Sequence, residues 1–369
     1  MYRIGLDIGS TTIKTAVLDD NGTLVRSNYQ RHNSDVRATM YGELKNLLKL
    51  YDEFTITVTG SGGISVSEWL GIPFVQEVIA GVEAIKRLIP ETDVAIELGG
   101  EDAKITYLGN NLDQRMNGTC AGGTGAFIDQ MAVLLNTDAS GLNELAKSAT
   151  IIHPIASRCG VFAKSDIQPL INDGAQKSDI AASVFQSVVN QTISGLACGK
   201  PIRGNVAFLG GPLHFLSELG ARFVATIRPQ KAIFPENSQV FNAIGAAYKS
   251  DKVFTATELL EKLEQVKDIA ESEVTRLDPL FKDKQELTDF RLRHSKVSIP
   301  FADVKAHKGA TFLGIDAGST TTKVALIDGD GGLLYSWYGS NSGDPLASVT
   351  EIIKQIYDIL PDDAYIGYG

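Results

Sequence analysis

The chain contains one segment twice. Gly5–Asp19 reads GLDIGSTTIKTAVLD, and Gly314–Asp328 reads GIDAGSTTTKVALID. In each copy, alternating apolar residues flank a Gly-Ser-Thr-Thr turn and end at a second turn rich in Asp and Gly, which is typical of a β-hairpin. One such hairpin is weak evidence, but a pattern kept in two places predicts a structural unit that the chain uses twice.

The chemistry of the turn points to phosphate. Glycine lets the backbone approach an oxyanion, the hydroxyls and amides offer donors, and a lysine supplies positive charge. Asp7 can hold a magnesium ion through its water shell. We therefore expect a nucleoside triphosphate to contact the first turn, through Gly9, Ser10, Thr11, Thr12 and Lys14. The alternative reading, a plain hairpin turn, is weakened by the repeat.

A second hairpin follows the same logic. The apolar strand Asp93–Glu97 opens the loop Leu98–Asp102 and is followed by a strand from Ala103 to Leu108. Two such loops can face one another across a phosphate, in a cleft between two related subdomains. The residues expected to contact the nucleotide here are Gly99, Gly100 and Lys104. Lys104 could equally be a solvated strand residue.

A glycine pair further along the chain suggests an adenine site. The buried strand Asn205–Leu209 leads into Gly210 and Gly211, where a flat ring could lie against the backbone, and Gly245 lies in a small-residue helix that could pack on this loop. A helix-capping turn is the competing interpretation of the glycine pair.

Composition limits the possible functions. The 369 residues carry 34 Lys and Arg against 44 Asp and Glu, a net charge of −10, which disfavours binding to nucleic acid or to an anionic membrane. No apolar run approaches the ~20 residues that cross a bilayer, so we expect a cytoplasmic protein. Three cysteines make a disulfide framework unlikely to be the organising feature.

The predicted domain organisation has three parts. Residues 1–250 form one nucleotide-binding unit with a mainly helical middle third; 251–308 form a charged helix (Thr255–Leu277) and a connector (Phe281–His307) without a clear period; 309–369 repeat the start of the first unit. The repeat stops before a second phosphate loop, so we expect uncovered sheet faces there and a longer polypeptide with two tandem units.

The order of the motifs resembles that of the actin-like ATPase superfamily. The resemblance rests on Asp7–Lys14, Gly60-Ser-Gly62, Glu97–Lys104 and Gly210-Gly211. It implies a ribonuclease H-like α/β fold with two related subdomains around a nucleotide cleft, with Gly60 and Gly62 at the nucleotide. The superfamily usually opens its second motif with aspartate, so whether Glu97 or Asp102 positions the attacking water stays open.

The sequence contexts of two cysteines indicate one family within this superfamily. Cys120, in Asn117–Asp129, and Cys159, in Ser157–Asp166, stand in contexts similar to those of 2-hydroxyacyl-CoA dehydratase activators, the BadF/BadG/BcrA/BcrD-type ATPases. The resemblance implies that two subunits share one four-iron four-sulfur cluster. Because each cysteine precedes a helical stretch, unpaired amides at the helix start would stabilise the thiolate. The alternative interpretation of Cys120 and Cys159 is simple burial. Cys198 is assigned no role.

The resemblance implies an ATP-dependent electron-transfer activator. MgATP hydrolysis would drive an electron from ferredoxin or flavodoxin, through the cluster, to a dehydratase or a benzoyl-CoA reductase. The cluster would lie in a homodimer or between two tandem units. The alternative from another class is a small-molecule kinase, with Asp102 as its base; a chaperone-like scaffold lacks an evident peptide-binding domain.

Overall fold

The chain divides into two compact units. The computed structural model describes residues 1–109, 111–117, 122–156, 160–268, 278–318 and 320–369. The first unit contains Met1–Val133, Thr137–Ile167 and Gln176–Glu273; the second contains Leu134–Asn136, Gln168–Ala175 and Val274–Gly369. Across these described stretches, no helix is long and apolar enough to cross a membrane.

The first unit begins with a mixed sheet of five strands in the order β10-β4-β1-β2-β3. Its strands are Tyr2–Ile8 (β1), Thr12–Leu18 (β2), Leu24–Arg31 (β3), Glu53–Thr59 (β4) and Val253–Thr255 (β10). β1 pairs antiparallel with β2 and parallel with β4. Ile4, Leu6 and Ile8 of β1 are buried in one core cluster, and Gly5 and Asp7, which alternate with them, are buried on the other face of the sheet, so β1 is covered on both faces.

A second sheet of five strands repeats this topology in the order β7-β6-β5-β8-β9. Its strands are Val94–Leu98 (β5), Ala103–Tyr107 (β6), Asp113–Asn117 (β7), Asn205–Leu209 (β8) and Lys231–Ile233 (β9). The order β7-β6-β5-β8 is equivalent to β3-β2-β1-β4. Strand β7 was not predicted, because this edge strand reads Asp-Gln-Arg-Met-Asn and carries no apolar alternation.

Helices surround these sheets, and the middle third of the chain is mainly helical, as predicted. The α-helices of this part of the chain are Val36–Leu47 (α1), Gly63–Leu70 (α2), Glu77–Leu88 (α3), Gly125–Leu134 (α4), Ala139–Ala146 (α5), Gly160–Asn172 (α6), Lys177–Thr192 (α7), Gly211–Phe215 (α8), Ser217–Ile227 (α9), Phe241–Tyr248 (α10) and Ala256–Asp268 (α11). A π-helix, Ile193–Ala197, continues α7, and a 3-10 turn, Ser238–Val240, precedes α10.

Helix α10 packs against both halves of the first unit with almost no side chain between the backbones. A Cβ added at Gly5 of β1 would overlap the backbone of Ala243 in α10. On another side of α10, a Cβ added at Gly245 would overlap the backbone of Ala80 in α3. The two glycines therefore set the distance from α10 to the sheet and to α3.

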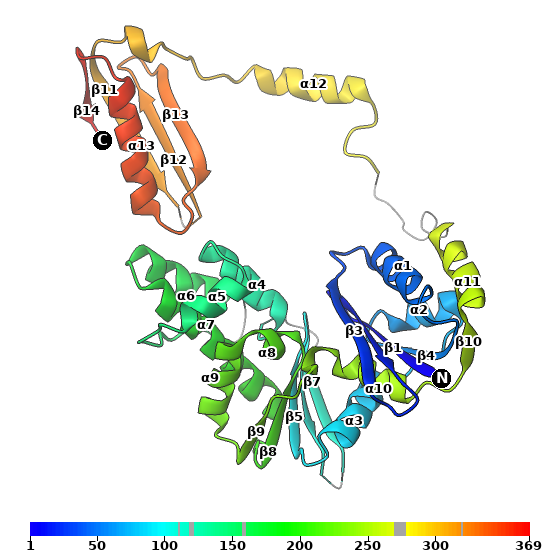
Figure 1. Cartoon of the computed structure of the whole chain (residues 1–369). Coiled ribbons are helices and arrows are strands. Elements are labelled where there is room, and N and C mark those ends of the chain that lie inside the picture. The colour runs from blue at the N-terminus through cyan, green and yellow to red at the C-terminus, as the bar shows by residue number, and fades with distance from the viewer. Residues whose placement is uncertain (110, 118–121, 157–159, 269–277, 319) are drawn as a thin grey trace. The chain divides into compact units, whose positions relative to one another are not determined.

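The second unit repeats the start of the first. Its strands Gly309–Ala317 (β11), Thr321–Ile327 (β12), Leu333–Ser340 (β13) and Ala364–Tyr368 (β14) have the order β13-β12-β11-β14, and Pro345–Ile359 (α13) takes the place of α1 in the sequence of elements. Figure 1 shows α13 lying along one face of this sheet, where Val324, Leu326, Ile352 and Ile356 form the core. Phe312 and Ile315 of β11 are exposed.

The connector was predicted as a polar, basic stretch without a clear period, and part of it is a helix. Lys284–Ser295 form a helix (α12), which begins where the carboxylate of Asp283 accepts a hydrogen bond from the N–H of Glu286. In return, Glu286 accepts a hydrogen bond from the N–H of Lys282. This reciprocal cap starts a helix that buries no residue, so no apolar period marked it in the sequence.

The two copies of the hairpin allow a matched test of the α10 contact. Gly5→Val places a side chain against the backbone of α10, which cannot rotate away, so we expect a loss of at least about 3 kcal/mol in the free energy of unfolding. Gly314→Val, at the same place in the second copy, meets only Ala325 O at 3.9 Å and should change stability by less than about 0.5 kcal/mol. Chemical denaturation measures both, and equal losses would contradict this account.

Candidate nucleotide-binding site

The first phosphate turn is a two-residue turn whose geometry depends on β1, β2 and β3. The N–H of Gly9 donates to Thr12 O at 2.9 Å, and Asp7 and Lys14 lie opposite one another, with Nζ 2.7 Å from Oδ2. His32, just after β3, holds the turn from the side, because its Nε2 lies 3.1 Å from Gly9 O and its backbone N–H donates to Thr11 O.

The second turn has the same geometry and touches the first. The N–H of Gly99 donates to Asp102 O at 2.8 Å, and Glu97 lies opposite Lys104, as Asp7 lies opposite Lys14. A Cβ added at Gly100 would overlap the side chain of Thr11. The expectation that the two loops face one another therefore agrees with their positions.

The connecting Gly60-Ser-Gly62 segment lies against the end of β1. Gly60 has a φ of +92°, and a Cβ there would overlap Ile8 O and approach Oδ1 of Asp7. The N–H of Gly62 donates to Ile8 O at 2.9 Å. These contacts fix the backbone that carries Asp7 into the cleft.

Lys104 lies in a buried cluster of carboxylates. Its Nζ is 2.6 Å from Glu77, 2.7 Å from Asp102 and 3.6 Å from Glu97. The amide nitrogen of Asn242, in α10, donates to both Glu77 and Glu97. The ammonium of Lys104 is surrounded by these carboxylates and the residue is 3% exposed, and the phosphate contact expected of it stays a prediction.

The charges of this cluster shift the pKa values of its members. Burial raises the pKa of Glu77 to about 7, against the opposing effect of Lys104. Burial lowers the pKa values of Lys14 and Lys104, but the nearby carboxylates outweigh it and raise both above the ordinary lysine value. Both lysines are therefore charged, and the proton that titrates near neutral pH belongs to Glu77.

Asp7 has the features required of a carboxylate that faces a hydrated magnesium ion. Its Oδ1 is buried and has no hydrogen-bond partner among the residues that the structure describes. A small cavity of about 20 Å³, lined by Asp7, Lys14, Glu97 and Asn242 among others, has room for one water molecule. An oxygen donor set of this kind suits Mg²⁺.

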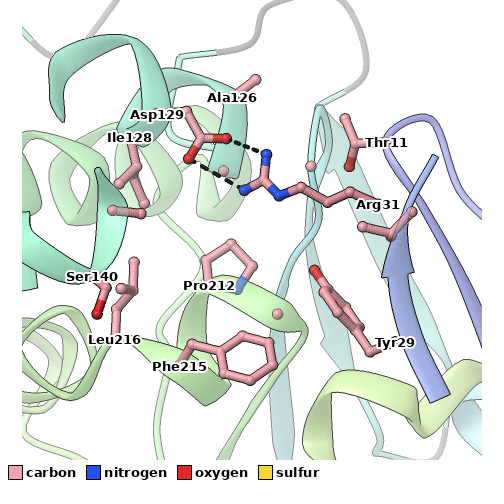
Figure 2. A pocket seen from close by; sticks show the side chains of 15 residues that line it. Thr11, Tyr29, Arg31, Ala126, Ile128, Asp129, Ser140, Pro212, Phe215 and Leu216 are labelled. Carbon is pink, nitrogen blue, oxygen red and sulfur yellow. Dashed lines mark hydrogen bonds and ion pairs between the residues drawn. The ribbon is translucent and has the colours of Figure 1, made fainter. Parts of the chain in front are cut away.

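Two larger pockets meet at the two turns. One, of about 510 Å³, is lined by residues of both turns, including Gly9, Ser10, Lys14, Glu97 and Asp102, and also by Gly60. The other, of about 490 Å³, is shown in Figure 2 and is lined by Thr11, Thr12 and Gly100, by Gly211 and Pro212 of α8, and by Arg31 and Asp129. Thr11, Thr12 and Gly100 line both pockets.

The predicted adenosine glycines reach this site, whereas Gly245 does not. Gly210 has a φ of +90°, and a Cβ there would overlap the backbone of Leu98; a Cβ at Gly211 would overlap the hydroxyl of Tyr29. Gly245 lies at the crossing of α10 and α3, so its role in the structure is helix packing.

The two predicted cluster ligands, Cys120 and Cys159, lie outside the described residues. In the described residues, a Cβ added at Gly160, the first residue of α6, would lie 3.5 Å from the ring of Phe127 in α4. Within the described residues, no group of three or more His, Cys, Asp or Glu is arranged to hold a metal ion. Cys198 is exposed, and its Sγ lies 3.4 Å from Gly195 O.

One expectation about the helix starts needs correction. The N–H groups of Gly125 and Ala126, at the start of α4, donate to Gly99 O at 3.0 Å and to Gly100 O at 2.7 Å. These two amides are therefore not available to a thiolate. They connect α4 to the second phosphate turn instead.

Comparison with known proteins identifies the family. The model of the BadF/BadG/BcrA/BcrD ATPase family matches residues 4–249. The chain belongs to this ATPase family. It is 31% identical over 280 residues to the 2-hydroxyisocaproyl-CoA dehydratase activator of Clostridioides difficile, which covers 73% of this chain and 100% of that protein. It is also 30% identical over 259 residues to the activator of lactoyl-CoA dehydratase of Anaerotignum propionicum. That match covers 67% of this chain and 96% of the relative.

Solved structures of this family confirm the predicted actin-like fold. The activator of the 2-hydroxyisocaproyl-CoA dehydratase from Clostridium difficile with bound ADPNP matches with a TM-score of 0.59 and 28% identity, over 76% of this chain and 100% of that chain. Component A of the (R)-2-hydroxyglutaryl-CoA dehydratase of Acidaminococcus fermentans matches with a TM-score of 0.59 and 27% identity. That match covers 68% of this chain and 97% of component A.

Three residues of the site were missed by the analysis of the sequence. Glu77 and Asn242 meet at the carboxylate cluster from two different helices, and His32 supports the first turn. None of them lies in a glycine motif. A polar residue at the start of an apolar helix, as Glu77 is in α3, was the one signal that the sequence offered.

The raised pKa of Glu77 predicts a pH-dependent stability. An acid whose pKa is higher in the folded chain (about 7) than in the unfolded chain (4.5) stabilises the fold fully below pH 4.5, and this contribution is lost as pH rises through 7. Relative to Glu77→Gln, the free energy of unfolding of the unaltered chain should therefore fall by on the order of 2 kcal/mol between pH 5 and pH 8.

Denaturation at several pH values measures this difference. Glu144→Gln in α5 is the control for loss of a surface carboxylate, because that side chain is 64% exposed and lies outside the cluster around Lys104. A difference for Glu77→Gln that stays constant from pH 5 to pH 8 would show that Lys104 keeps Glu77 ionised throughout.

Proposed function

We propose that this chain is an activator that couples hydrolysis of MgATP to electron transfer at low potential. In this proposal, a four-iron four-sulfur cluster held by Cys120 and Cys159 supplies the electron to a 2-hydroxyacyl-CoA dehydratase or a benzoyl-CoA reductase-like partner. Ferredoxin or flavodoxin is the proposed donor. The support comes from the family, from relatives that are named dehydratase activators, and from the geometry of the two phosphate turns.

The nucleotide fits the residues at the turns. The glycines of both turns leave backbone exposed, and Lys14 Nζ lies 3.6 Å from the place where a Cβ of Gly9 would be, so its charge is close to the turn. A solved relative carries ADPNP, which supports ATP as the ligand of this chain. Bound Mg²⁺ would neutralise phosphate charge, with Asp7 as the residue that faces its water shell.

The structure offers a reason to choose between the two candidate water-positioning residues. Asp102 is committed to Lys104 by an ion pair of 2.7 Å, whereas Glu97 is 3.6 Å from the same nitrogen and lines both the small cavity and the larger pocket at the turns. We therefore assign the positioning of the attacking water to Glu97. Asp102 then holds Lys104 in place.

The observation that best supports coupling is the pair of hydrogen bonds from α4 to the second turn. Gly99 and Gly100, which flank the proposed phosphate site, accept hydrogen bonds from the first two residues of α4. Cys120 precedes this helix in the sequence by five residues. A change of the second turn on hydrolysis would therefore be passed directly to the helix that follows one cluster ligand.

The cluster requires a second contributor. A cubane takes four thiolates, and in this proposal the chain supplies two, Cys120 and Cys159, so the other two come from a second chain or from a second complete copy of the ATPase unit. A two-fold contact presents the same residues from both sides and would complete the site. A Cβ added at Gly160, the residue after Cys159, would lie 3.5 Å from the ring of Phe127 in α4, the helix that follows Cys120 in the sequence, which supports a contribution of both segments to one site.

Substitution of the two carboxylates tests their roles. Glu97→Gln should lower the rate of ATP hydrolysis by at least about 100-fold and change the Kd of MgADP by less than about 3-fold, because it removes a group needed in the transition state. Asp102→Asn should lower the rate by less than about 10-fold. Phosphate release and calorimetry measure these effects, and the reverse order would assign the role to Asp102.

Iron content tests the cluster. After anaerobic reconstitution we expect about two iron and two sulfide per chain, with broad absorbance near about 400 nm, as one cubane shared by two contributors requires. Cys159→Ala should lose the iron and keep nucleotide binding, whereas the control Cys198→Ala should keep both. Iron in Cys159→Ala equal to that of the unaltered chain would remove the assignment, and a phosphorylated small molecule as product would indicate a kinase.

A further inference from the structure

An ion pair crosses the pocket shown in Figure 2. The guanidinium of Arg31, the last residue of β3, pairs with the carboxylate of Asp129 in α4 through two contacts, Nη1 to Oδ2 at 2.7 Å and Nη2 to Oδ1 at 3.2 Å. The side chains are 59% and 37% exposed. Of the described residues that line this pocket, Arg31 is the one cation and Asp129 the one carboxylate.

The ion pair joins the first phosphate turn to the helix that the second turn holds. Arg31 lies opposite Thr12 in the β2–β3 ladder, and Thr12 ends the first turn. Asp129 lies one turn of α4 beyond Ala126, whose N–H donates to Gly100 O. These contacts therefore connect the first turn to the second turn around the pocket. They run through Arg31, Asp129 and α4.

We propose that Arg31 binds a phosphate group of the nucleotide and that Asp129 competes with the nucleotide for it. In this proposal, which rests on the proposed function, nucleotide binding withdraws Arg31 from Asp129 and releases α4 from the first turn. Asp129 is thus a residue that regulates nucleotide affinity and connects occupancy of the pocket to α4.

The chemistry of the two partners favours this exchange. An exposed carboxylate–guanidinium pair contributes little to stability, so it opens at low cost. The fork of donors on arginine fits phosphate oxygens as well as it fits carboxylate, and a nucleotide carries several negative charges against one on Asp129. A carboxylate left beside a bound phosphate would repel it. Coupling is reciprocal, so removal of the charge of Asp129 must tighten nucleotide binding if the proposal holds.

Titration calorimetry of the full chain with MgADP and with a non-hydrolysable MgATP analogue tests the proposal. We expect Asp129→Asn to lower the Kd by about 3- to 10-fold and Arg31→Gln to raise it by at least about 10-fold. In the double variant, the effect of Asp129→Asn should disappear, because there is no guanidinium left to release. Glu144→Gln, which breaks an exposed ion pair with Lys147 on α5, should leave the Kd unchanged.

Hydrogen exchange gives a second readout. Nucleotide should increase exchange of the amides around Asp129 in the unaltered chain, and Asp129→Asn should show the increase without nucleotide. Thermal melts identify any variant that fails to fold, and Arg31→Lys then replaces Arg31→Gln, with a smaller increase in Kd expected.

The signs of these effects separate the alternatives. If Asp129→Asn weakens binding, Asp129 orients Arg31 toward the phosphate and the competition is excluded; if it has no effect, the pair is a surface contact and the proposal fails. If the unaltered chain binds neither nucleotide, the proposed function fails, and with it the basis of this inference.

Discussion

The buried ammonium of Lys104 is the interaction on which the cleft depends. Three carboxylates approach it from different parts of the first unit, and without a cation their mutual repulsion and desolvation would prevent them from meeting. Lys14, which is paired with Asp7 at 2.7 Å, lines the larger pocket at the turns, whereas Lys104 is surrounded by three carboxylates. The two hairpins therefore have the same topology, but their lysines have different surroundings.

Asn242 extends this cluster from the second sheet to the helix that packs on the first. Its amide nitrogen donates to Glu77 and Glu97, and its helix, α10, lies against Gly5 of β1. A shift of α10 would therefore disturb the sheet packing and the carboxylates together. Because α10 contacts both the sheet and the carboxylates, the site formed by the two separate hairpins has a defined geometry in the first unit.

The local parts of this arrangement were predictable, and the long-range parts were not. Both hairpins, their glycine turns and the strand Asn205–Leu209 follow from alternation and turn residues, which act over a few positions. The strand Asp113–Asn117 and the exposed helix α12 lack an apolar period, so no local pattern revealed them. The position of Lys104 in its hairpin matches that of Lys14, but the hairpin sequence gives no sign of Glu77, which lies 27 positions earlier and pairs with Lys104.

The two copies of the first hairpin show which features depend on the local sequence and which depend on long-range packing. Both copies form the same Asp–Lys pair, and in both the turn glycine donates its N–H to the carbonyl of the threonine three residues later, Gly9 to Thr12 and Gly318 to Thr321. In both, a side chain that follows the third strand contacts the same glycine, His32 to Gly9 and Asn341 to Gly318. The aspartate, however, is 1% exposed in the first copy and 69% exposed in the second. The hairpin sequence therefore determines the shape of a phosphate turn, whereas burial of its carboxylate requires the packed elements of the first unit.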